Sequence, residues 1–311
     1  MKILKKIKQS HGICLLIIAC CCLPSASGYA QDGNSADNTA PVEKTYTRNT
    51  FAGNMIIDNQ SVMVPLEKTI EFAIQHRFGI INNGYADFYG MFAPANIRLG
   101  MNYTPIKNLQ LGIGLTKGNM LVDGNLKYAI IKQAESGGSP VSVTYYGDMA
   151  ISTIPQAGNF VNNADRISYF NQLIIARKVT KEFSVQVSPS LSYFNNIVGY
   201  VAPDGSIQPT MKNANFSIAF SGRYKVTGAM SIMVNYDQPL TQNLTNNPLP
   251  NISLGLEFST TGHTFQIFAT DYQGIIPQYN NVFNQIDCSK GQFLIGFNIT
   301  RRWYHDSDKE K

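Results

Sequence analysis

The sequence predicts an all-β fold, a transmembrane antiparallel up-and-down β-barrel of about twelve strands with short periplasmic turns and long extracellular loops. Three observations predict it. From Glu71 to Trp303, segments of roughly ten residues alternate apolar with small or polar side chains. The connectors between these segments alternate between long and short. Charged residues make up only 14% of the chain and aromatic residues 11%, as expected when half of every strand faces hydrocarbon.

Residues 1–30 have the pattern of a secretory signal peptide. Lysines precede an apolar stretch at 13–23, and small residues lead to a cleavage site after Ala30. The apolar stretch is too short to span a bilayer as a helix. An alternative stays open, because the residues before Cys20 also fit a lipoprotein signal that would leave Cys20 lipidated. Cleavage after Ala30 leaves Cys288 as the remaining cysteine, which excludes an intramolecular disulfide.

The mature chain divides into three parts. Residues 31–66 are expected to form a periplasmic N-terminal leader, which is polar and without periodicity as far as Thr47. Residues 67–304 form the barrel, and residues 305–311 form a polar C-terminal tail. Alternation predicts strands at 70–78, 96–103, 109–115, 121–132, 141–151, 167–175, 183–193, 215–224, 230–236, 252–258, 264–270 and 293–303.

Connector lengths predict the orientation of the barrel. Connectors after odd-numbered strands are mostly long and those after even-numbered strands are short, which places both ends of the barrel chain in the periplasm. The third connector, 116–120, is short where a long loop is expected, and the next, 133–140, is a little longer. If the predicted strand count is wrong, we expect the error to lie between residues 116 and 140.

A secreted soluble β-sandwich or ligand-binding barrel would also alternate. Two features count against it. The faces opposite the apolar ones are almost wholly Ser, Gln, Ala and Asn, whereas a solvent-facing side normally carries Lys and Glu. Aromatic residues also stand at strand ends, where interfacial girdles belong; they are Phe78, Tyr103, Tyr193, Tyr224, Tyr236 and Trp303.

Ordered motifs along the chain resemble a Bacteroidota outer-membrane β-barrel family of unknown function, domain of unknown function 5777. The motifs lie at 69–79, 95–100, 112–114, 126–128, 176–178, 261–266 and 296–301. Residues 51–62 resemble the N-terminal extension of that family. Thr261-Gly262 stands where the family usually has two glycines before the histidine. The resemblance implies an outer-membrane barrel and supplies no reaction or substrate. The family-motif residues singled out are His76, Arg77, Phe78, Gly79, Gly262 and His263.

The histidines give no sign of a metal or catalytic site. His76 shares the parity of the lipid-facing residues near the outer rim, and His263 falls at a periplasmic turn. A barrel-wall hydrolase would need a serine within reach of a histidine that a third polar group orients. His263 and Asp271 are about 26 Å apart at about 3.3 Å per residue, so they cannot belong to one triad. We predict no enzymatic activity, no metal and no cofactor.

Charged residues with lumen parity are the candidates for function. Arg77 and Arg98 lie at one depth on adjacent strands and would form a positive outer constriction of a narrow channel for small solutes. The alternative is that the charges pair with each other and with Asn and Gln, giving a plugged structural or partner-binding barrel. The lumen-facing charged candidates are Glu71, Arg77, Arg98, Lys127, Arg223, Glu257 and Arg302.

If the first and last strands close the barrel by antiparallel pairing, Glu71 and Arg302 would face each other across the seam on the lumen side. The expected partners are outer-membrane lipid and lipopolysaccharide, the barrel-assembly machinery, and a small solute or a periplasmic partner. No basic patch points to nucleic acid.

Overall fold

The computed structural model describes residues 45–155 and 160–304. The signal peptide at 1–30, both candidate processing sites, residues 31–44 of the leader and the tail at 305–311 lie outside the described residues. Within the described part, no helix is long and apolar enough to cross a membrane.

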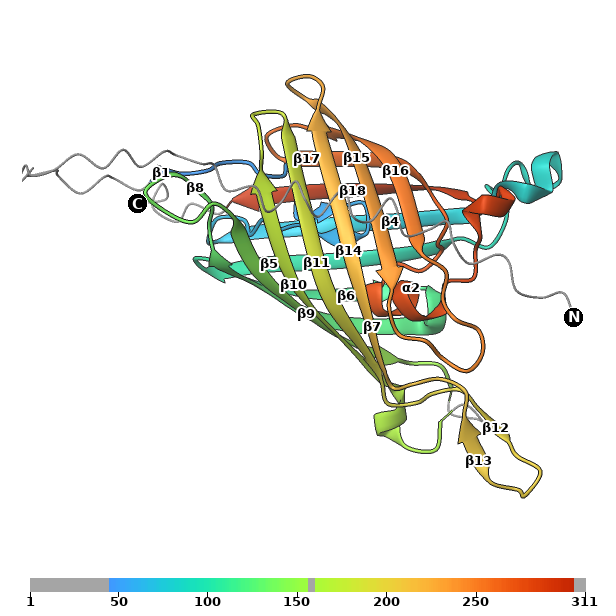
Figure 1. Cartoon of the computed structure of the whole chain (residues 1–311). Coiled ribbons are helices and arrows are strands. Elements are labelled where there is room, and N and C mark those ends of the chain that lie inside the picture. Colours follow the sequence, from blue (N-terminus) through green and yellow to red (C-terminus); the bar gives the residue numbers. More distant parts are fainter. Residues whose placement is uncertain (1–44, 156–159, 305–311) are drawn as a thin grey trace, which may run out of the picture. The chain divides into compact units, whose positions relative to one another are not determined.

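Twelve antiparallel strands close into one barrel (Figure 1), as the sequence predicts. Every predicted strand has its counterpart, and the boundaries agree to within a few residues. The strands are β4 (Thr69–Ile80), β5 (Asn96–Ile106), β6 (Leu109–Thr116), β7 (Leu121–Ile131), β9 (Ser142–Ser152), β10 (Ile167–Lys178), β11 (Phe183–Phe194), β14 (Ala214–Lys225), β15 (Met230–Pro239), β16 (Asn251–Ser259), β17 (His263–Thr270) and β18 (Leu294–Tyr304).

The strand faces differ as a membrane barrel requires. On β17, Phe265 and Ile267 point outward and are exposed, while Thr264, Gln266 and Thr270 point inward and are buried. Successive side chains of a strand point to opposite faces, so an alternating sequence gives an apolar outer surface and a polar lumen. This arrangement repeats around the barrel and turns most of the buried polar side chains toward its interior.

The seam of the barrel has the predicted register. Strand β18 pairs with β4, and Arg302 lies opposite Glu71. The first and last strands thereby satisfy each other's backbone groups, and no strand of the barrel is left with an open edge.

The connectors fall into two sets at the two ends of the barrel. Short turns at 107–108, 179–182, 226–229 and 260–262 join strands at the end where the barrel chain begins. The short third connector contains η2 (Gly118–Met120) and joins two real strands, so the strand count holds there. The connector after β7 contains β8 (Ala134–Ser136), which pairs with β1 (Thr45–Tyr46).

The long connectors carry structure of their own. They contain η1 (Ile81–Asp87), η3 (Asn163–Arg166), the hairpin of β12 (Gly199–Val201) with β13 (Ile207–Pro209), α2 (Pro277–Phe283) and η4 (Cys288–Lys290). The β12–β13 hairpin extends beyond the strand ends, whereas α2 lies over β10, β11, β14 and β15 (Figure 1).

The segment 50–63, called the plug segment below, corrects the sequence interpretation. It belongs to the stretch 31–66 that was predicted to be a periplasmic leader, yet it lies inside the barrel. Its hairpin of β2 (Met55–Ile56) and β3 (Asn59–Gln60) is almost wholly buried. Strands of two residues leave no readable alternation, and the partners that bury them are far away in the sequence.

Candidate functional site

The plug segment enters and leaves the lumen at one end of the barrel. Before it, Thr47 N donates to Gln133 O in the connector after β7, at 2.8 Å. After it, Lys68 N donates to Thr104 O on β5, at 2.7 Å. The plug segment is therefore a loop pushed into the barrel from the end where β4 begins.

Polar side chains of the wall hold the backbone of the plug segment. Asn298 Nδ2 donates to Ile57 O at 2.6 Å, and Gln186 Nε2 donates to Gln60 O at 2.8 Å. Further side chains that donate to plug oxygens are Lys127 to Asn54, Gln266 to Met55, Asn235 to Ile56 and Thr144 to Val62. These donors stand on strands all around the barrel, so they supply the hydrogen bonds that a buried backbone needs.

The lumen also offers the plug segment an apolar surface. Phe51, Ile56, Ile57 and Val62 form one buried cluster with wall residues. The wall members are Tyr146, Phe170, Ile174, Ala176, Met233 and Phe268. Burying apolar surface stabilises the folded state by about 25 cal/mol for each Å² removed from water. The apolar wall residues of this cluster interrupt the otherwise polar lumen face of their strands.

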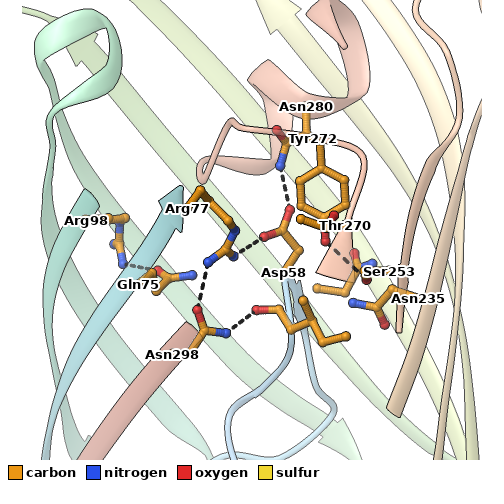
Figure 2. A network of polar contacts seen from close by, with 12 residues as sticks. Asp58, Gln75, Arg77, Arg98, Asn235, Ser253, Thr270, Tyr272, Asn280 and Asn298 are labelled. Atoms are coloured by element: carbon orange, nitrogen blue, oxygen red, sulfur yellow. Dashed lines mark hydrogen bonds and ion pairs between the residues drawn. The ribbon is translucent and has the colours of Figure 1, made fainter. Parts of the chain in front are cut away.

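The tip of the plug segment forms an ion pair with the barrel wall (Figure 2). Arg77 Nη2 lies 2.6 Å from Asp58 Oδ1, and both side chains are almost wholly buried, at 0% and 4% exposure. Arg77 also donates to Asn298 Oδ1 at 3.0 Å, and its guanidinium carbon lies 4.5 Å from the centre of the Phe268 ring. At the same tip Ile57 has φ 56°, a left-handed conformation that is rare for a β-branched residue.

The opposite end of the lumen is covered by the connector that contains α2. Asn280 Nδ2 donates to the second oxygen of Asp58 at 2.5 Å, and Gln278 Nε2 donates to Asp148 Oδ1 on β9 at 2.8 Å. Tyr279 and Phe283 pack edge-on against Phe194 of β11. Asp58 is thus the point where the plug segment from one end and α2 from the other end are joined (Figure 2).

Arg98, the second arginine of the predicted constriction, is also paired. Its Nε and Nη2 atoms lie 2.9 and 2.5 Å from the two carboxylate oxygens of Asp123, and its Nη1 donates to Gln75 at 3.1 Å. Both arginines lie on the lumen side of the wall and are buried. Because Asp58 and Asp123 neutralise them, they do not form an open positive ring, and their arrangement agrees with the alternative in which the lumen charges are paired.

At the entrance of the plug segment, Glu71 receives several donors. Asn54 of the plug segment and Asn102 of β5 donate to Glu71 Oε1 at 2.7 and 3.1 Å. The seam partner Arg302 is farther away, with Nε 3.9 Å from Glu71 Oε2, and it also donates to Ala52 O at 2.9 Å. Lys127 joins both limbs of the loop, with Nζ 2.8 Å from Asn54 O and 3.4 Å from Met63 O.

The last two charged candidates form a pair of their own. Arg223 Nε lies 2.8 Å from Glu257 Oε1, and Glu257 Oε2 accepts from Gln266 at 3.0 Å. All seven charged candidates therefore lie on the inner side of the barrel wall, and each one contacts a charged partner or the plug segment.

The family-motif residues other than Arg77 contribute to side-chain packing or to turns between strands. His76 faces outward and stacks on Phe297 with ring centres 4.9 Å apart, beside Phe78. Gly79 lies so close to Ala93 that an added Cβ would clash. Gly262 lies in the β16–β17 turn, where its carbonyl accepts from Arg302 N at 2.8 Å.

His263 stacks on Phe265. Ser259 Oγ, on the strand that precedes this turn, has no hydrogen-bond partner among the described residues.

Sequence reasoning missed Asp58, Asp123, Asp148 and α2. One signal for the plug segment was visible: Met55-Ile56-Ile57 is an apolar run that follows the polar stretch ending at Thr47. The resemblance to the family extension at 51–62 covered the same residues without indicating where they lie.

A closed barrel with an apolar outer face and a polar, plugged lumen defines a membrane-bound β-barrel protein. The chain belongs to the family described as membrane bound beta barrel domain, domain of unknown function 5777, whose profile matches residues 51–303. No curated protein matches it.

Solved structures give low similarity. The NanC porin aligns with a TM-score of 0.45 and 11% identity, covering 76% of this chain and 100% of that one. The KdgM porin aligns with a TM-score of 0.43 and 8% identity, covering 76% of this chain and 99% of that one. An outer-membrane channel from Pseudomonas putida F1 aligns with a TM-score of 0.37 and 11% identity, covering 78% of this chain and 97% of that one. At these scores the likenesses carry no argument about what this chain does.

Proposed function

We propose that this protein is a non-enzymatic outer-membrane β-barrel that conducts small solutes and is closed at rest by its own plug segment. The observation that supports the proposal is the way this segment is held. It lies in a polar lumen, contributes no strand to the barrel, and is bound largely by neutral side chains such as Gln186, Asn235 and Asn298. Such a segment can leave the lumen without separating any pair of barrel strands.

Each neutral hydrogen bond that holds the plug segment is weak enough for the segment to be displaced. A neutral hydrogen bond contributes about 0.5–1.5 kcal/mol net, and water replaces the lost partners when the plug segment moves. The barrel hydrogen bonds between strands are untouched by that movement. The gating cost thus falls on these neutral side chains and on the Arg77–Asp58 ion pair at the plug tip, which makes the proposal testable by substitution.

Planar-bilayer conductance tests the proposal. We expect the wild-type protein to give no regular conductance steps, and Gln186→Ala with Asn235→Ala to give discrete steps, because the pair loses the bonds to Gln60 O, Val62 N and Ile56 O without unpairing a buried charge. The matched control is Gln172→Ala, a buried lumen residue of β10, which should stay as silent as the wild type.

Two outcomes would contradict the proposal. Regular steps from the wild-type protein would mean that the plug segment does not close the lumen. A silent double variant would favour the second candidate, a structural or partner-binding barrel. That candidate has its own supporting observation, because α2 closes the other end of the lumen through Asn280 and Gln278.

The proposed orientation, with the long connectors outside the cell, has a separate test. In a Cys288→Ser background, cysteine at Leu244 should react with a membrane-impermeant reagent in intact cells, and cysteine at Gly228 only after the outer membrane is permeabilised. Leu244 is exposed in the long connector after β15, and an added Cβ at Gly228 meets nothing within 4 Å. The opposite labelling pattern would reverse the orientation.

A further inference from the structure

The connector between β4 and β5 presents an unusual group of exposed aromatic residues. Tyr85 is 84% exposed and Phe92 is 81% exposed. Phe88, Tyr89 and Met91 between them are also exposed. Residues 84–93, called the aromatic loop here, therefore place five large apolar or aromatic side chains on one short stretch of surface. Exposed apolar groups of this density mark a surface that contacts something other than water.

The aromatic loop is an ordered structure. Asp87 Oδ1 accepts from Gly90 N at 2.8 Å, and its Oδ2 accepts from Asn83 Nδ2 at 3.0 Å. At the base of the loop, Gly79 N donates to Gly90 O at 2.9 Å, an approach so close that a Cβ on Gly90 would clash with the Gly79 carbonyl. The loop is thus fixed on the end of β4, and its shape is set before any partner binds.

The backbone of the loop is strained in a way that exposes the rings. Phe88 and Tyr89, at φ 51° and 56°, are consecutive non-glycine residues in the left-handed region. Bulky side chains rarely adopt this conformation, and such strain is concentrated at functional positions. The rings pair with one another, Tyr85 with Tyr89 and Phe88 with Phe92, and the strain is not offset by burying them in the protein.

We propose that the aromatic loop inserts its side chains into the interfacial layer of the membrane leaflet at this end of the barrel. The loop is continuous with the lipid-facing surface, because β4 ends in the outward ring cluster of His76 and Phe78 with Phe297 of β18. Asp87 is the single charged residue between positions 80 and 95, and its carboxylate is used within the loop. A loop that carries Phe and Tyr but no lysine or glutamate has the composition of the aromatic belt at membrane interfaces.

A lipid contact there would also support the cover over the lumen. Gln273 Nε2 donates to Pro94 O at 2.7 Å, and Asn96 Nδ2 donates to Gln273 O at 3.0 Å. Gln273 follows Tyr272, which is buried beside the plug tip (Figure 2). The aromatic loop and the α2 connector are therefore joined at their bases, so an anchored loop gives the cover a fixed point.

Tryptophan fluorescence tests the proposal without depending on channel activity. In a Trp303→Phe background, Phe92→Trp and the control Leu244→Trp would each be the single tryptophan. Both are measured in phosphatidylcholine vesicles with brominated or unbrominated acyl chains. We expect bromination to quench Phe92→Trp about twofold, with little effect on Leu244→Trp, because the first lies at the acyl boundary and the second in water. Tyr85→Trp provides a second position if Phe92→Trp does not fold.

Iodide in the aqueous phase separates the remaining outcomes. Quenching of the loop tryptophan by iodide and not by brominated lipid would place the loop in water. Protection from both quenchers would mean that another protein surface covers it, for example a second copy of this chain. Either result would overturn the lipid proposal.

Discussion

Replacing Asp58 with alanine should open the barrel to ions and lower the free energy of unfolding by about 3–5 kcal/mol. The change removes the carboxylate that binds Arg77 at 2.6 Å and Asn280 at 2.5 Å. It leaves a wholly buried guanidinium without its counter-ion, and it breaks the contact between the plug segment and α2. Conductance in planar bilayers and urea unfolding in detergent measure the two effects.

A double variant separates the gate from stability. Arg77→Met with Asp58→Ala removes both charges and should recover much of the lost stability, since the buried cation is gone. The plug tip remains detached from α2, so conductance should persist. Asp204→Ala, at an exposed aspartate of the β12–β13 hairpin, is the matched control and should behave as the wild type. A stable, silent Asp58→Ala protein would show that Asp58 does not hold the gate.

Glu71→Ala should lower the free energy of unfolding by about 3 kcal/mol, and Arg302→Ala by about 1 kcal/mol or less. The two seam partners differ because Glu71 is wholly buried and accepts from Asn54 and Asn102, whereas Arg302 is 25% exposed and 3.9 Å away. Loss of Glu71 also leaves Lys127 buried without its nearby carboxylate. Heat-modifiability on gels and urea unfolding in detergent would rank the variants.

The charge-reversed pair provides the control for this seam. Glu71→Arg with Arg302→Glu should fail to restore stability, because the new arginine would lie beside Lys127 and cannot accept from Asn54 or Asn102. Restoration would mean that a direct ion pair latches the seam. Equal loss in Glu71→Ala and Arg302→Ala would likewise contradict the role given to the plug segment in holding Glu71.

The barrel could be predicted strand by strand because the alternation that defines each strand is a local sequence pattern. A lipid-facing strand must alternate, and this alternation is visible in neighbouring residues such as Phe297 and Asn298. The seam register followed from the same parity once the strand count was even, and Arg302 lies opposite Glu71 as expected. The parity of Arg77, Arg98 and Lys127 was readable for the same reason.

The partners inside the lumen could not be predicted in this way. Arg98 pairs with Asp123, and Asp148 binds Gln278 of α2. These contacts depend on the stagger of the closed barrel and on the folding of connectors, which have no period. The sequence therefore left open whether the arginines are free or paired, and the structure shows that Arg77 pairs with Asp58 and Arg98 with Asp123.

The sequence by itself determined the twelve-stranded barrel, its lipid-facing and lumen-facing sides and its seam, because each follows from the two-residue period of a strand. Only the tertiary structure decided what fills the lumen. Residues 50–63 are stable there because wall side chains from many strands supply the hydrogen bonds and apolar contacts that this short segment lacks. Those partners come together only when the barrel closes, so the plug segment and its meeting with α2 at Asp58 are properties of the fold.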